Sequence, residues 1–256
     1  MSPHADWLVP DWLAAGVGAV MTTRNGGASV APFDRMNLRG GLGDDPAAVA
    51  TNHATLATAI GVRPVFLNQV HGSRVVRLTR ADSLPNAALH EADACITTEP
   101  GLPCVVQVAD CLPVLFAVPG VAAVGAAHAG WRGLAGGVLE NTLKAVCDAA
   151  RCEPSAVHVW LGACIGPQRF EVGMDVLEAF GVQPAHADAA RFQPHGPGKW
   201  LAHLPLLARD RLRAAGVSRI TGGDWCTVKS PSRFFSYRRD GLTGRMAALV
   251  WIHPLG

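Results

Sequence analysis

Apolar residues along this chain gather in short runs that are rich in Val, Ile and Leu and bounded by Gly, Pro or Asp. Runs of this length and composition are typical of buried β-strands. A turn at Pro119–Gly120 would separate two of them. The pattern predicts strands at these positions: Val65–Val70, Arg74–Thr79, Ala92–Thr97, Cys104–Ala109, Val114–Val118, Val121–His128, Val157–Gly162, Ser218–Thr221 and Met246–Ile252.

Other segments carry a helical pattern. In Gly133–Ala150, apolar residues recur at spacings that place them on one helix face. Pro46–Ile60 is rich in Ala and follows two aspartates, which is typical of a helix start. Leu204–Ala215 would end at the following glycine. The Gly- and Pro-rich stretch Pro194–Gly198 is interpreted as a surface loop.

The order of these elements indicates the fold class. Predicted strands cluster in the first half of the chain, and strands and helices mix in the second half. This order favours an α+β fold, with mixed β-sheets packed between helical layers. Hydrophobic residues make up 49% of the chain and charged residues 16%, so most of it should be buried in a folded core. No low-complexity linker interrupts the 256 residues, and we interpret residues 1–256 as a single domain.

The charge and the cysteine content indicate which partners and which cellular compartment to expect. The net charge of +2 provides no basic footprint for nucleic acid or for an anionic membrane surface. The uncharged run Cys111–Ala127 is interrupted by Pro and Gly and is too short to span a bilayer. Seven cysteines and an N-terminus without the features of a signal peptide indicate a reducing, cytoplasmic setting. We therefore expect small-molecule partners, no nucleic acid, no membrane, and a monomer.

Three side chains form a candidate metal site. Cys111 and His128 lie at the ends of two apolar runs, and His71 lies upstream in the segment NQVHG. Two imidazoles and a thiolate suit a catalytic zinc ion, which keeps one position open for water or substrate. Spacing alone is weak support, because no motif places two ligands on one turn, and Cys and His also serve as ordinary buried residues.

The residues around these side chains strengthen the metal interpretation. Small residues flank both histidines, so a ligand could approach the backbone closely. Gly130 and Arg132 open a predicted helix beside His128, where an anion would be stabilised. Farther along the chain, Phe234–Arg245 holds aromatics and arginines that would form either a wall for an anionic or aromatic ligand or a hairpin whose arginines pair with acids. Arg24 precedes an Asn-Gly turn.

Several long motifs resemble one known family. The motifs are NQVHG around His71, ADCLPVLF around Cys111, AAHAGWRGLAGGVL around His128, IGP with FEVG at Ile165–Gly173, and FFSYRRDGLTGRMA near the end of the chain. In this order they resemble the YfiH-type family, long labelled laccase-like polyphenol oxidases and later recognised as zinc-dependent purine nucleoside phosphorylases. The chain departs from the usual pattern at His53, Cys164 and His203.

The resemblance implies a fold, a cofactor and an activity. The fold would be the YfiH-like α+β architecture, and His71, Cys111 and His128 would bind zinc. The implied activity is phosphorolysis of adenosine, inosine and 5′-methylthioadenosine to the free base and the sugar 1-phosphate, with adenosine deamination as a further activity. Within that chemistry, Glu171 is the candidate for proton transfer in deamination. The candidates for orienting phosphate are Arg132, Gly130 and Arg24.

Two other enzyme classes fit the same side chains. Two histidines and a cysteine are also the equatorial ligands of a blue-copper centre, so copper in this site would give a polyphenol oxidase. A multicopper laccase needs many paired histidines, and the chain contains no His-X-His sequence. Without a metal, Cys111 as nucleophile and His128 as base would form a cysteine amide hydrolase acting on a cell-wall precursor.

Overall fold

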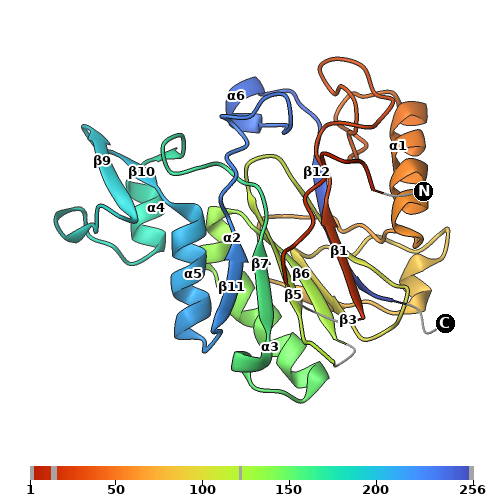
Figure 1. The fold of residues 1–256 in the computed structure, drawn as a ribbon. Helices are drawn as coiled ribbons and strands as arrows, with labels where there is room; N and C mark the ends of the chain where they lie inside the picture. Colours follow the sequence, from red (N-terminus) through yellow and green to blue (C-terminus); the bar gives the residue numbers. More distant parts are fainter. Residues whose placement is uncertain (1–2, 13–15, 121–122, 254–256) are drawn as a thin grey trace.

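The structure is a computed structural model that describes residues 3–12, 16–120 and 123–253 (Figure 1). A six-stranded sheet has the order β11 (Arg219–Gly222), β7 (His158–Leu161), β5 (Leu112–Ala117), β6 (Val124–Ala129), β3 (Ala94–Thr97) and β2 (Val75–Arg77). A second sheet has the order β1 (Val17–Met21), β12 (Met246–Ile252) and β4 (Cys104–Val108). A third has the order β8 (Glu171–Val172), β10 (Lys199–Ala202) and β9 (Phe192–Gly196).

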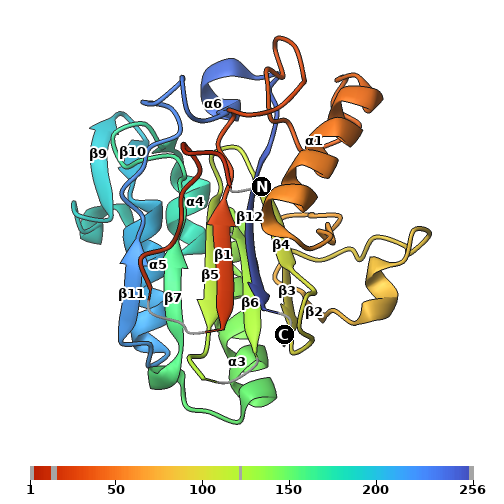
Figure 2. The ribbon, with the colours of Figure 1, turned by 45° about the vertical axis from the view of Figure 1, so that its right-hand side comes forward.

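Helices cover the outer faces of the six-stranded sheet and of the β1–β12–β4 sheet. The α-helices are α1 (Pro46–Ile60), α2 (Trp131–Ala135), α3 (Val138–Ala150), α4 (Met174–Ala179), α5 (Leu204–Ala214) and α6 (Tyr237–Asp240). The α3 and α5 helices lie against one face of the six-stranded sheet, and the β1–β12–β4 sheet packs on its other face (Figure 1). The α1 helix covers the far side of that smaller sheet (Figure 2). This layering confirms the predicted α+β class with mixed sheets between helical layers. Within the described ranges, no helix has the length and apolar character needed to cross a membrane.

The alternation of side chains along each strand builds separate hydrophobic layers. In β5, Val114 and Phe116 face the helices, whereas Leu115 and Ala117 face the smaller sheet. In β12, the even-numbered residues face the six-stranded sheet and the odd-numbered residues face α1. Both faces of these strands are therefore buried, which explains why their sequences are continuous apolar runs without polar alternation.

Three of the predicted elements need correction. Val65–Val70 forms only isolated bridges, because the side chain of Gln69, and not its backbone, bonds to the main chain of Gln107. The predicted helix Gly133–Ala150 is divided into α2 and α3, since Gly137 adopts a left-handed φ of 88°. Pro194–Gly198 belongs to the β9–β10 hairpin.

The sequence pattern also missed several short elements. These are β1, β8, β9, β10, α4 and α6. The remaining predicted strands and helices are present, most of them with shorter bounds. The predicted strand Val121–His128 starts outside the described residues, and its described part is β6.

A buried amide holds the loop between β1 and α1 in place. Asn52 is fully buried on α1, and its Oδ1 atom accepts the N–H of Ala28 at 2.7 Å. Its Nδ2 atom donates to the backbone carbonyls of Arg35 and Asn37 at 3.0 and 2.8 Å. Since the segment that follows Asn37 reaches the functional site, Asn52 links the packing of α1 to the position of that segment.

We expect Asn52→Ala to lower the free energy of unfolding by roughly 2–4 kcal/mol, because it leaves several buried backbone groups without partners. Thr51→Ala removes one exposed hydrogen bond on the same helix and should change the free energy by less than about 0.5 kcal/mol. Urea unfolding of both variants would check this. Equal midpoints would show that Asn52 is not a structural anchor.

Candidate functional site

The register of the β5–β6 hairpin brings Cys111 and His128 together. His128 pairs with Pro113 and Ala129 with Leu112, so Cys111, immediately before β5, lies beside the end of β6. Gly130 follows there, and a Cβ atom at this position would lie 2.9 Å from the His71 ring and 3.1 Å from Cys111 Sγ. A glycine is therefore required for the three side chains to meet.

Asp93 fixes both histidines. Its carboxylate is fully buried and accepts the Nδ1–H of His128 at 2.8 Å. The same carboxylate accepts the backbone N–H groups of Val70, His71 and Gly72 at 3.1, 2.9 and 2.7 Å. His71 is held in a left-handed conformation with φ of 63°. With its Nδ1 atom occupied, His128 directs its Nε2 atom toward Cys111 and His71, as metal-binding histidines commonly do.

The three donors have the chemistry and the spacing of a metal site. One donor atom from each of His71, Cys111 and His128 lies within 4.8 Å of the others. Cys111 Sγ and His71 Nε2 are 3.8 Å apart, and tetrahedral zinc would hold such a pair at about 3.6 Å. His128 is buried, Cys111 is half-buried and His71 is exposed, so an ion bound here would keep one side open to the cavity. These residues fit a metal ion.

Without an ion, the cluster carries opposite charges. Burial alone would raise the pKa of the Cys111 thiol, but the positive charge of His128 and hydrogen bonds from both histidines lower it to about 6. Burial alone would lower the pKa of His128, but the Cys111 thiolate and the Asp93 carboxylate raise it to about 9. A thiolate at neutral pH is the form that binds a metal or attacks an electrophile.

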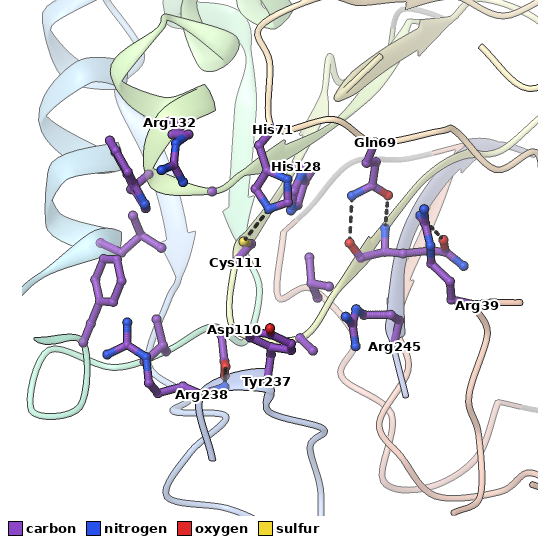
Figure 3. Close-up of a pocket in the computed structure, with 18 of the residues that line it drawn as sticks. Arg39, Gln69, His71, Asp110, Cys111, His128, Arg132, Tyr237, Arg238 and Arg245 are labelled. Atoms are coloured by element: carbon purple, nitrogen blue, oxygen red, sulfur yellow. Dashed lines mark hydrogen bonds between the residues drawn. The ribbon is translucent and has the colours of Figure 1, made fainter. Parts of the chain in front are cut away.

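The cluster lies at the base of a cavity with a volume of about 490 Å³ (Figure 3). Aromatic and apolar residues form one part of its lining, and polar residues form another. The lining includes four arginines: Arg39, Arg132, Arg238 and Arg245. Arg132 lies over the Trp131 ring at 4.1 Å from its centroid, and Arg238 over the Phe170 ring at 5.6 Å.

Asp110 joins the cluster to the C-terminal segment. Its backbone φ is 90°, and its carboxylate accepts hydrogen bonds from Thr227 Oγ1, Ser236 Oγ and the N–H of Arg238. The carboxylate therefore holds the start of α6 beside Cys111. Asp110 makes no direct contact with a histidine of the cluster; that contact is made by Asp93.

The structure places two of the sequence candidates outside the cavity. Glu171 lies on β8, where the neighbouring Val172 points into the core, so the Glu171 carboxylate points outward and lies 3.7 Å from His195. Arg24 bonds to Asp34 at 3.1 Å and stacks on Phe235, which makes it part of the scaffold. Neither residue is part of the described cavity lining, whereas Arg132 and Gly130 both are.

Arg39 also lines the cavity, as do Gln69 and Gln107, which bond to each other, and no sequence motif indicated a role for these residues in the site. Arg39 comes from the loop before α1, and its role depends on contacts across the sequence. Arg245 was included only as one of three arginines in Phe234–Arg245. That segment is not a hairpin; it contains the short helix α6. The expected aromatic and arginine wall is present in part, since Tyr237, Arg238 and Arg245 line the cavity.

His53, which departs from the family pattern, contacts the loop that carries Arg39. Its Nε2 atom is 2.8 Å from the carbonyl oxygen of Leu38, and its ring stacks on Phe66. It is not among the described cavity-lining residues.

Comparison with known proteins identifies the family. Residues 18–253 match the family model described as multi-copper polyphenol oxidoreductase laccase. The chain belongs to this family. A Pseudomonas aeruginosa protein named purine nucleoside phosphorylase is 47% identical over 247 residues, which cover 96% of this chain and 98% of that protein. The Escherichia coli protein named purine nucleoside phosphorylase YfiH is 47% identical over 248 residues, with coverages of 96% and 98%.

The fold of the polyphenol oxidoreductase laccase family is also seen in solved structures. The crystal structure of a Neisseria meningitidis protein superposes with a TM-score of 0.89 and 44% identity, covering 97% of this chain and 100% of that one. The expected YfiH-type fold is therefore confirmed. In the described part of the chain, His71, Cys111 and His128 are the one group of three or more His, Cys, Asp or Glu side chains close enough to share a metal ion.

The charge state of the cluster can be tested in protein stripped of metal. We expect the rate of Cys111 alkylation by iodoacetamide to rise with a midpoint near pH 6, because His128 stabilises the thiolate. Asp93→Asn should move the midpoint upward, since it removes a carboxylate that raises the pKa of His128. Cys147, whose pKa is raised to about 12 by burial and by Cys152, should stay unmodified in the same sample.

Peptide mass spectrometry across the pH range would read out each cysteine separately. A Cys111 midpoint at the ordinary thiol value of about 8.5 would show that the three side chains are not coupled as described.

Proposed function

We propose that this protein is a zinc-dependent purine nucleoside phosphorylase that acts on adenosine, inosine and 5′-methylthioadenosine, with adenosine deamination as a side activity. The observation that carries the proposal is the cluster of His71, Cys111 and His128 at the base of a cavity lined by arginines and aromatic rings. The names of the Pseudomonas aeruginosa and Escherichia coli relatives support the same activity.

Zinc is the favoured ion because two histidines and a cysteine with one open side are the ligands of known catalytic zinc sites. When bound, such an ion would act as a Lewis acid toward a substrate oxygen or nitrogen. Copper can use the same donors, but a blue-copper centre also takes a weak axial methionine. No methionine is among the described residues of the lining.

The cavity residues suit the two substrates of phosphorolysis. A volume of about 490 Å³ lies within the usual range for small-molecule sites. Trp131, Phe170 and Tyr237 offer rings against which a purine can stack. Arg132, beside Gly130 at the edge of the cavity, would contact the bound nucleoside and neutralise negative charge on the leaving base.

Deamination is proposed as the weaker activity. It requires a group that carries protons to and from the purine ring. Glu171 lies outside the described lining, and Asp110, the one carboxylate within it, already accepts three hydrogen bonds. Phosphorolysis needs no such group in direct contact with the purine amine.

One observation favours a second candidate, a metal-free cysteine amide hydrolase. Cys111, His128 and Asp93 are arranged as nucleophile, base and orienting carboxylate, and the pKa of Cys111 is lowered to about 6. A thiolate bound to zinc is a poor nucleophile, so metal content separates the two functions.

Protein purified without added metal should contain about one zinc ion per chain, because one open three-ligand site is available. With adenosine and inorganic phosphate it should form adenine and ribose 1-phosphate, and Cys111→Ala should lose both the zinc and the products. Metal analysis and chromatography of the products would check this. Metal-free protein without nucleoside cleavage, but with amidase activity that depends on Cys111, would establish the second candidate instead.

We expect Asp93→Asn to weaken zinc binding by roughly 10–100-fold, because the carboxylate orients His128 and the loop that carries His71. Asp82→Asn is the matched control, since Asp82 also bonds to a histidine, His90, but at the surface. Competition with a chromophoric chelator would measure both affinities. Equal affinities would show that Asp93 does not support the metal site.

A further inference from the structure

Arg39 and Arg245 lie side by side on one wall of the cavity. In Figure 3 they stand on one side of the His71, Cys111 and His128 cluster, and Arg132 and Arg238 stand on the other. Both Arg39 and Arg245 are half-buried, whereas Arg132 and Arg238 are exposed. We call Arg39 and Arg245 the inner pair and Arg132 and Arg238 the outer pair.

The inner pair places two positive charges together without a directly paired acid in the described part of the chain. Within the described residues, neither guanidinium has a carboxylate oxygen within salt-bridge distance. Burial lowers the pKa of Arg245, and the charge of Arg39 lowers it further. Holding like charges together away from water is unfavourable unless an anion joins them. The pair therefore favours the binding of a negatively charged group.

The remaining donors of the pair are available for such an anion. Arg39 bonds through Nη1 to Gln107 Oε1 at 3.2 Å. Arg245 bonds through Nη1 to the carbonyls of Thr243 and Gly244 at 2.8 and 3.1 Å. A guanidinium has five N–H donors, so most of those on both side chains remain for a ligand. The N–H donors of two guanidinium groups, each arranged as a planar fork, match the oxygens of a tetrahedral dianion.

A buried amide sets the separation of the two arginines. Asn37 is fully buried, and its Oδ1 atom accepts the backbone N–H of Arg39 at 3.1 Å and that of Arg245 at 2.9 Å. Gln107 reinforces this arrangement, because its amide donates to the carbonyl of Leu38 while its oxygen accepts from Arg39. The pair is therefore preorganised before any anion binds.

We propose that Arg39 and Arg245 form the subsite for the inorganic phosphate that attacks the nucleoside. This proposal rests on the proposed phosphorylase function. Displacement at C1′ requires the phosphate on the face opposite the leaving base. The rings of Trp131 and Phe170 lie beside Arg132 and Arg238 on one side, and the inner pair, with Arg245 at 5.8 Å from the centroid of the Tyr237 ring, lies on the other (Figure 3). The two walls therefore meet this requirement.

Phosphorolysis between the two walls needs no reactant besides phosphate and the nucleoside. An oxygen of hydrogen phosphate forms a bond to C1′ while the C1′–N9 bond breaks. The electron pair of that bond leaves with the purine, and the proton of hydrogen phosphate ends on the base. Arg39 and Arg245 hold the dianion and orient it toward C1′, so their contribution is to positioning and charge stabilisation.

The test is steady-state kinetics of the zinc-loaded protein with phosphate and adenosine varied separately. Arg39→Gln and Arg245→Gln should each raise the KM for phosphate at least tenfold, and the KM for adenosine should stay within about twofold. Arg39→Lys, which keeps the charge but not the fork, should lie between wild type and Arg39→Gln. Arg80→Gln is the control, because the Arg80 side chain is 78% exposed and is not among the described residues of the cavity lining.

Isothermal titration of the same proteins with inorganic phosphate separates this proposal from the proposed function. If wild type cleaves no nucleoside but binds phosphate, and Arg39→Gln and Arg245→Gln lose that binding, the subsite stands and the phosphorylase function fails. If phosphorolysis is strong and both variants keep the wild-type KM for phosphate, the subsite is overturned. A raised KM for phosphate in Arg132→Gln alone would also overturn it and place the anion on the opposite wall.

Discussion

The functional site depends on one buried carboxylate. Asp93 accepts hydrogen bonds from His128 on β6 and from the backbone around His71, and it thereby joins these two segments. A charge buried this completely is unfavourable unless donors surround it. Its hydrogen bonds therefore hold the loop at residues 70–72 against β6. In this position His71 and His128 both face Cys111. The metal cluster is in this sense a consequence of satisfying Asp93.

The surrounding layers provide the rigid frame that this arrangement needs. Asp93 precedes β3, which pairs with β6, while β6 pairs with β5. Cys111 therefore receives its position from the same sheet that positions Asp93 and His128. The buried apolar residues on both faces of these strands prevent a slip in register, which would turn every side chain to the opposite face. Of the three candidate ligands, His128 lies within this sheet and Cys111 lies directly before β5, so the fold itself sets the spacing of these two side chains.

The sequence predicted what depends on local pattern and missed what depends on distant contacts. Continuous apolar runs located β5, β6 and β12, because strands buried on both faces carry a strong signal. The weak two-residue strand β8 carried none, so the outward direction of Glu171 could not be foreseen. Motif resemblance brought together His71, Cys111 and His128. It could not reveal that Arg24 is engaged by Asp34, nor that Arg39 reaches the cavity, since both depend on how the loop before α1 folds.

The two walls of the cavity are held by different layers of the fold, and in the proposed function this would separate the binding of the base from the binding of the anion. Arg39 and Arg245 are joined through Asn37 to the smaller sheet and, through the loop beside Asn52, to α1. Trp131 and Phe170 belong to the opposite layer, with α2 and the hairpin sheet. Substitutions in one layer can alter the recognition of the base while the anion subsite and the cluster keep their geometry. If the proposed function holds, a cluster at the junction of two layers would let the displacement chemistry persist while the base specificity changes.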